Sequence, residues 1–180
     1  MLKKIKLIAV FGIFILSFAS HFMFDLYPNI LVSFFFPVNE SIWEHMKIIY
    51  SSTLIYGIFD YLLLRYNKVS FNNFSWQLFI TSFSEIIIFL LIYLPIYKLV
   101  GEALPVTLLL MILVYGIGQA ISYYILKHKD IHYLNFISFF LIVFVYVIFI
   151  ILTYNPPHKE IFYDTNGGYY GIKRLTIHNE

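Results

Sequence analysis

Cysteine is missing from the sequence, and charged residues are scarce. Only 12% of the 180 residues are Asp, Glu, Lys or Arg, whereas 61% are hydrophobic and the mean hydropathy is +0.80. Without cysteine, disulfides, thiolate catalysis and cysteine-ligated metal sites are excluded, so any metal must be held by His, Asp or Glu. A water-soluble domain of this size needs a more polar surface, so the composition predicts an integral membrane protein.

A strong excess of one charge is also missing, since the formal net charge is only +2. No basic patch with interleaved aromatic residues occurs, which excludes nucleic acid as an expected partner. The expected surroundings are instead a lipid bilayer. Because no internal repeat or low-complexity segment divides the chain, we expect a single membrane domain over residues 1–180.

Five apolar runs are long enough to cross a bilayer as helices. They cover about 7–25, 41–64, 76–97, 104–126 and 133–154. The shorter apolar segment 26–36 is broken by Pro28 and Asn29, which predicts an interfacial or re-entrant piece. In the tail, 155–180, two aromatic stretches around Asn166-Gly167-Gly168 predict a small hairpin. The fold class is therefore all-α, an integral membrane bundle of five transmembrane helices.

Lys and Arg are distributed unevenly between the two ends of these spans. One end holds Lys3, Lys4, Lys6, Arg65, Lys68, Lys127 and Lys129, and the other holds Lys47, Lys98, Lys159, Lys173 and Arg174. The positive-inside rule then predicts a cell-membrane protein with a cytoplasmic N-terminus and an extracytoplasmic C-terminus. This orientation gathers an acidic and histidine-rich set at the extracytoplasmic face: His21, Asp25, Glu40, Glu44, His45, Glu102, His158, Glu160 and Asp164.

The most reactive side chains lie in residues 37–47, Pro-Val-Asn-Glu-Ser-Ile-Trp-Glu-His-Met-Lys. Ser41 and Glu44 have the spacing of a capping box, which predicts the start of the second span. On that helix Glu40, Glu44 and Lys47 would share one face, with His45 about a quarter-turn away. One interpretation is a hydrated helix start, where acidic side chains favour the positive end of the helix dipole. Capping accounts for only one or two of these groups, so the alternative is a functional site.

Charged residues inside the predicted spans form a second set of candidates. Glu85 lies near the middle of the third span and must face the bundle interior, either as a clamp between helices or as a binding group. Asp60 lies close to Arg65 near the end of the second span, so we expect its carboxylate at the membrane interface. His21 and Asp25 are one turn apart, so the carboxylate can hold the imidazole in one tautomer. Pro95 is expected to kink or end its span.

Two classes of function follow from these residues. In the first, His21, His45 and His158 bind a divalent metal such as Zn²⁺, and Glu40, Glu44 and His45 carry out metal-assisted hydrolysis or transfer on a lipid-linked substrate. In the second, the chain is a small-molecule binding or transport subunit. Its ligand-binding candidates are Asn39, Trp43, Glu85 and Asp164. A third reading is an accessory membrane protein without catalytic activity.

Residues 37–45, in the pattern Pro-Val-Asn-Glu-Ser-x-Trp-Glu-His, also carry a resemblance. Together with Pro156-Pro157-His158 and Phe162-x-Asp164 they resemble a family of small, uncharacterised bacterial multi-pass membrane proteins. The resemblance implies a helical bundle of similar length over most of the chain. It implies no activity.

Overall fold

The computed structural model describes residues 1–101 and 103–172. Glu102, Lys173 and Arg174, which entered the charge comparison, lie outside these residues. Within them the chain forms six α-helices: α1 (Leu2–Leu26), α2 (Ile30–Phe35), α3 (Ile42–Tyr66), α4 (Phe74–Val100), α5 (Leu104–Lys127) and α6 (His132–Tyr154). All except α2 are long and apolar enough to cross a membrane, which confirms the predicted bundle of five spans.

The helix boundaries follow local signals in the sequence. Asn29 caps the short helix α2 by accepting a hydrogen bond from the Val32 amide, within the segment predicted as interfacial or re-entrant. Pro105 lies in the first turn of α5, where its missing N–H leaves no helical bond unmade. Pro95 does not end α4, which continues to Val100.

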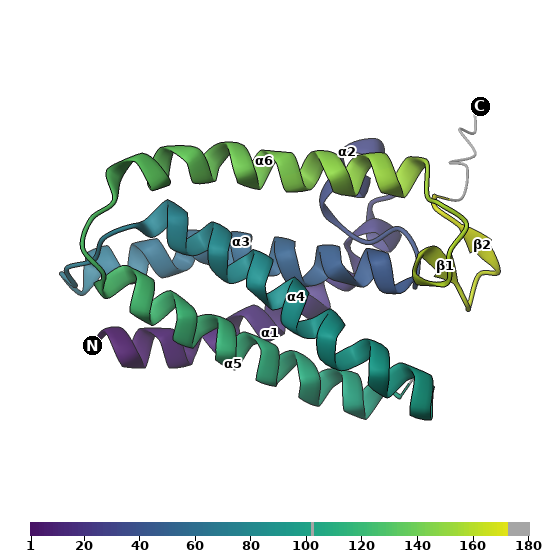
Figure 1. The fold of residues 1–180 in the computed structure, drawn as a ribbon, viewed down its shortest axis with the longest axis horizontal. Helices are drawn as coiled ribbons and strands as arrows, with labels where there is room; N and C mark the ends of the chain where they lie inside the picture. Colours follow the sequence, from purple (N-terminus) through teal and green to yellow (C-terminus); the bar gives the residue numbers. More distant parts are fainter. Residues whose placement is uncertain (102, 173–180) are drawn as a thin grey trace.

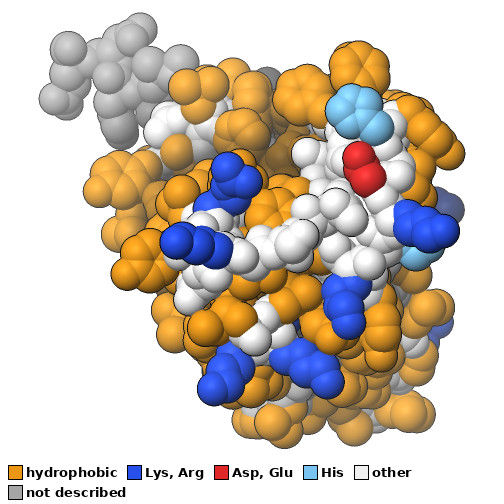
Figure 2. All heavy atoms as spheres, turned by 90° about the vertical axis from the view of Figure 1, so that its left-hand side faces the viewer, with side chains coloured by type: hydrophobic (Ala, Val, Ile, Leu, Met, Phe, Trp, Pro, Cys, Tyr) orange, Lys and Arg blue, Asp and Glu red, His pale blue; other side chains and the backbone are white. Residues whose placement is uncertain are grey.

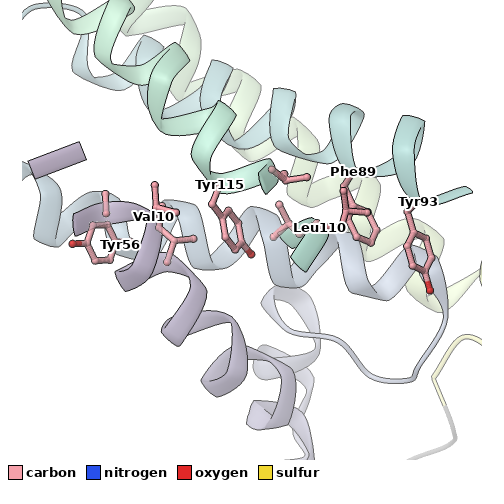
Figure 3. Packing of buried hydrophobic residues seen from close by; sticks show 10 residues of the cluster. Val10, Tyr56, Phe89, Tyr93, Leu110 and Tyr115 are labelled. Carbon is pink, nitrogen blue, oxygen red and sulfur yellow. The ribbon is translucent and has the colours of Figure 1, made fainter. Parts of the chain in front are cut away.

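Helices α1, α3, α4 and α5 form a closed ring, because each packs against its two neighbours in the order α1, α3, α4, α5 (Figure 1). Helix α6 lies outside this ring and packs against α4 and α2. A row of buried side chains fills the ring, labelled Val10, Tyr56, Phe89, Tyr93, Leu110 and Tyr115 in Figure 3. The outer surface is also apolar, and Phe136, Phe140 and Phe144 of α6 are each more than half exposed. Such a surface suits lipid tails.

The chain ends in a short tail at one end of the bundle. A 3₁₀ turn (η1, Glu160–Phe162) leads into a two-stranded antiparallel hairpin, β1 (Tyr163–Asp164) and β2 (Tyr169–Tyr170). The predicted hairpin is therefore confirmed. We call this end, with α2 and the loop 36–41, the hairpin end, and the opposite end, with the N-terminus, the N-terminal end (Figure 1).

Basic side chains surround the N-terminal end, which Figure 2 shows face on. They belong to the start of α1 and to the α3–α4 and α5–α6 connections: Lys3, Lys4, Arg65, Lys68, Lys127 and Lys129 are exposed there. This clustering is the pattern on which the predicted orientation of the termini rests.

Lys6 is not part of that exposed set, and the expectation for Asp60 was wrong. Both side chains are buried, and Lys6 Nζ forms an ion pair with Asp60. Helix α1 already begins at Leu2, so Lys6 lies inside the bundle and faces Asp60 across the antiparallel α1–α3 contact. The carboxylate of Asp60, expected at the membrane interface, is therefore neutralised by Lys6 in the interior. A buried charge is tolerated only when it has a partner of opposite charge.

The orientation can be tested with single cysteines, because the native chain has none. We expect Ser70→Cys, at the N-terminal end, and Asn166→Cys, in the hairpin, to react with an impermeant maleimide from opposite sides of intact cells. The Asn166 variant should react from outside. Both native side chains are exposed, so labelling reports access and not burial. Reaction of both variants from the same side would contradict an odd number of spans.

Candidate metal centre

The loop 36–41 is fixed by the residues of the sequence motif themselves. Ser41 caps α3 by accepting a hydrogen bond from the Glu44 amide at 3.3 Å, so the predicted helix start is confirmed. Asn39 accepts from the Ser41 amide at 2.9 Å and donates to the Gly171 carbonyl at 2.8 Å. Gly171 has φ +67° and lies close to the Thr153 carbonyl, where a side chain would collide. Asn39 therefore ties the loop to the tail.

Glu44 is almost completely buried and engages both of its carboxylate oxygens. Oε2 accepts from Lys47 Nζ at 2.6 Å and from the Val38 amide at 3.1 Å. Oε1 accepts from the hydroxyl of Thr153 on α6 at 2.6 Å. Lys47 also donates to the Ser33 carbonyl at 2.9 Å, at the end of α2. These contacts give Glu44 and Lys47 a structural role that connects α3 with α2, α6 and the loop.

The prediction that Glu40 shares one helical face with Glu44 and Lys47 was wrong. It assumed that the helix extends through residue 40. Helix α3 begins at Ile42, so Glu40 precedes the cap and its side chain points away from that pair. Its Oε2 atom lies 3.4 Å from His21 Nε2 and 3.5 Å from His45 Nε2. His21 was expected to pair with Asp25, one turn along α1, but the carboxylate that it contacts is Glu40.

The protonation of His45 can be inferred from its hydrogen bond. His45 Nδ1 lies 2.9 Å from the Ser41 carbonyl oxygen, which can only accept, so Nδ1 carries a proton. In a neutral ring Nε2 then holds a lone pair that faces the Glu40 carboxylate. Two acceptors at this separation repel unless a cation lies between them, either a proton on the ring or a metal ion. A metal-bound histidine commonly donates its other N–H to a backbone carbonyl in this way.

The spacing of the three groups fits a metal site. One ligand atom from each of His21, Glu40 and His45 can be chosen so that all three lie within 4.8 Å of one another. Around a tetrahedral Zn²⁺ with bonds of about 2.0–2.1 Å, ligand atoms lie about 3.3 Å apart. The two separations from Glu40 are close to this value. Two histidines and one carboxylate leave a fourth position free, as in catalytic zinc sites.

The carboxyl group of Glu40 is held in its ionised form. Glu40 lies outside the spanning helices, and its hydrogen bond with His21 is the largest influence on its carboxyl group. That contact and the charges of His21 and His45 hold the pKa of Glu40 below its ordinary value, although partial burial acts in the opposite direction. Glu40 is therefore ionised at neutral pH.

Two cavities adjoin these ligands. An apolar cavity of about 200 Å³ lies between α1, α3 and α5, and its walls include Phe14, Phe18, Leu108 and Met111 together with His21 and His45. A small polar cavity of about 20 Å³ lies on the other side, lined by Glu40, His45, Tyr93, Tyr97, Glu160 and Tyr163. His45 forms part of both walls. One cavity suits a hydrocarbon chain and the other a polar group.

The other predicted site residues lie in the tail contact or in the bundle. Trp43 packs on Phe149 and Phe162, with ring centroids 5.3 and 4.9 Å apart, and so holds η1 against the bundle. Asp164 accepts hydrogen bonds from the amides of Asn166 and Gly167 and stabilises the hairpin turn. Glu85 is buried near the centre of the ring, away from the metal ligands.

His158 does not join His21 and His45. Its side chain is exposed and stacks on Tyr170, with ring centroids 4.6 Å apart. Sequence reasoning also missed Tyr93 and Tyr97, which line the polar cavity from α4. The two tyrosines are one helical turn apart near the end of an apolar span. This spacing was the signal in the sequence that could have identified them.

The role of the Glu44–Lys47 pair can be tested by unfolding the protein in detergent. Lys47→Met leaves a buried carboxylate without its cation, so we expect a loss of about 3–5 kcal/mol. The double variant Glu44→Gln, Lys47→Met should recover much of this loss, since no charge then remains buried. Lys98→Met, at an exposed position, serves as the control and should cost less than about 0.5 kcal/mol. Equal stability of Lys47→Met and Lys98→Met would contradict the structural role.

Comparison with known proteins locates the chain in a family without identifying an activity. No curated protein and no solved structure matches it. Residues 1–172 match the model of a "Family of unknown function (DUF6512)". The matched region includes His21, Glu40 and His45 as well as all five long helices. Because the match covers almost the whole chain, the protein belongs to DUF6512, a family of unknown function.

Proposed function

We propose that this protein is a membrane-embedded enzyme that holds a divalent metal such as Zn²⁺ between His21, Glu40 and His45. Its reaction is hydrolysis or transfer on a lipid-linked substrate at the extracytoplasmic face of the cell membrane. The observation that carries the proposal is the convergence of two imidazole nitrogens on one carboxylate oxygen, at 3.4 and 3.5 Å. The hydrogen bond from His45 Nδ1 to Ser41 turns the free lone pair of His45 toward that oxygen.

A bound divalent metal would supply a polarised substrate oxygen or a water of lowered pKa. The chain provides the ligands and the surroundings. Glu40 and His45 reach the polar cavity, where Glu160 and Tyr163 of the tail offer further polar contacts to a substrate. We assign Glu44 a positioning role, since its buried hydrogen bonds fix the loop that presents Glu40.

The apolar cavity supports a lipid-linked substrate. Its aromatic and aliphatic walls come mainly from α1 and α5, and its polar side chains are Ser17, His21, His45 and Thr107. A hydrocarbon chain in this cavity places the attached polar group beside the metal ligands. Contacts between the cavity walls and the hydrocarbon would hold the reacting group in position.

Metal content of purified protein tests the proposal directly. We expect about one zinc ion per chain, bound in the native protein and lost from His21→Ala, Glu40→Gln and His45→Ala. His158→Ala is the matched control, because its exposed ring stacks on Tyr170 and should leave the metal in place. Loss of metal from His158→Ala alone would instead move the site toward the tail.

Thermal unfolding provides a second measurement. Adding zinc to chelator-treated protein should raise the unfolding temperature of native protein and of His158→Ala, but not of the three ligand variants. At a free metal concentration about 100-fold above Kd, binding stabilises the folded state by about 2.7 kcal/mol. Absence of both bound metal and a metal-dependent shift would remove the basis for an enzyme.

A second candidate is a small-ligand binding or transport subunit. The observation that favours it is Glu85, whose carboxyl group is buried in the middle of α4. The proposed metal site does not use this carboxyl group. Buried ionisable groups inside a membrane commonly mark ion or substrate pathways.

A further inference from the structure

The half of the ring nearer the N-terminal end contains a buried polar layer. Each of its four helices contributes one side chain: Lys6 from α1, Asp60 from α3, Gln77 from α4 and Ser122 from α5. The Lys6–Asp60 ion pair joins α1 and α3. On the other side, Asn73 of α4 donates to the Ile125 carbonyl of α5 at 3.4 Å. Gln77 and Ser122 follow about one turn deeper from these two residues.

Several oxygens in and beside this layer lack partners. Within the described part of the chain, Asp60 Oδ1, Gln77 Oε1, Glu85 Oε1 and Ser122 Oγ are buried without a hydrogen bond. Nearly all buried polar groups in proteins are satisfied by protein atoms or by ordered water. Four such oxygens in this part of the bundle are therefore the atoms whose hydrogen bonding water or a cation would complete.

Glu85 lies next to this layer and fills the space beside a glycine of α5. Its Oε2 atom accepts from the hydroxyl of Thr53 at 2.5 Å, whereas Oε1 forms no hydrogen bond of normal geometry, although the side chain of Gln119 on α5 also interacts with the carboxyl group. Across the α4–α5 contact it faces Gly118, where an added Cβ would collide with the carboxylate. Glycine thus leaves space for the carboxylate between the two helices.

The charges around Glu85 do not neutralise it. From α1 it faces Lys6, which acts on it electrostatically but is bound to Asp60 of α3. From α5 it faces the neutral phenol of Tyr115, which is hydrogen-bonded to Ser17. Lys6 and Asp60 together carry no net charge, so an ionised Glu85 is left with one negative charge. Such a charge in the middle of a membrane costs about 2.5–3.5 kcal/mol or more.

A cavity beside this region includes Lys6 of the buried ion pair. A cavity of about 300 Å³ lies between α1 and α5, lined by Lys3, Lys6, Gln119 and Tyr123 among others. Gln119 directly follows Gly118, so the cavity reaches the depth of Glu85. A direct path along the axis of the ring is closed by packed Ile5, Leu64 and Leu126.

We propose that Glu85 is the binding group of a monovalent-cation site, for H⁺ or Na⁺, that exchanges with the N-terminal end through the cavity between α1 and α5. The cation supplies the one positive charge that Glu85 lacks, and the unpaired oxygens of Asp60, Gln77 and Ser122 hold the water that accompanies it. This site is separate from the metal centre and does not depend on the proposed enzymatic function.

The test uses dicyclohexylcarbodiimide, which adds to protonated carboxyl groups in apolar surroundings and leaves a stable acylurea. The full-length protein in lipid vesicles is treated at several pH values, with either sodium or choline as the cation, and modified Glu85 is quantified by peptide mass spectrometry. We expect modification to fall by about tenfold for each pH unit over which Glu85 ionises. Protection by sodium but not by choline identifies Na⁺ as a ligand, and pH dependence alone identifies H⁺.

Two variants of α5 test the geometry. In Gly118→Ala the new methyl group occupies the place of the carboxylate, so we expect at least a severalfold change in modification at Glu85. Leu113→Ala, at an exposed position of the same helix outside the cavity between α1 and α5, is the control and should behave as the native protein. Glu85→Gln should remain folded and lose any shift of unfolding temperature with sodium or pH.

Modification that is independent of pH and sodium would show a permanently protonated clamp and overturn the proposal. So would the absence of modification at every pH in a protein whose unfolding temperature is also insensitive to sodium and pH. Identical modification in Gly118→Ala and native protein would contradict the position assigned to the carboxylate.

Discussion

The buried ion pair between Glu44 and Lys47 is the constraint on which the hairpin end depends. Two charges removed from water are tolerable only when their hydrogen bonds are complete, and here Thr153, the Val38 amide and the Ser33 carbonyl complete them. These partners belong to α6, the loop and α2, so one pair fixes three segments around the start of α3. Since the face toward α6 is filled in this way, Glu40 is presented on the opposite side, where His21 and His45 lie.

Local features were predictable from the sequence, whereas contacts between helices were not. Hydropathy and length predicted the five long helices, and the capping residue Ser41 predicted where α3 begins. The error for Glu40 arose at that same boundary, because a residue just before the cap does not follow the helical rotation of about 100° per residue. The Lys6–Asp60 pair depends on how α1 packs on α3. The separation of His158 from His21 and His45 depends on how the tail folds back. A single sequence does not record that register.

Polar contacts between α1, α3, α4 and α5 hold the register of the ring. Ser20 pairs with Ser52 at 2.9 Å, Ser17 with Tyr115 at 2.6 Å and Thr53 with Glu85 at 2.5 Å. In a bilayer, moving an apolar helix surface from lipid into a helix contact gains little free energy. Hydrogen bonds and close packing of small residues therefore contribute most to specific association. The same contacts separate two regions of different chemistry. His21, His45 and Glu40 lie at the hairpin end, and the Lys6–Asp60 layer with Glu85 lies in the other half.

The two cavities beside His45 narrow the chemistry within the proposed function. A hydrocarbon chain in the apolar cavity brings its polar group to the ligands from the membrane side. A second reactant must then arrive through the polar cavity on the other face of His45. That space is about 20 Å³, and about 10–15 Å³ is enough for one water molecule. It admits water and is too small for a bulky acceptor unless the hairpin moves. For the proposed enzyme, this geometry favours hydrolysis over group transfer, and Glu160 and Tyr163 of the tail line the space through which water would arrive.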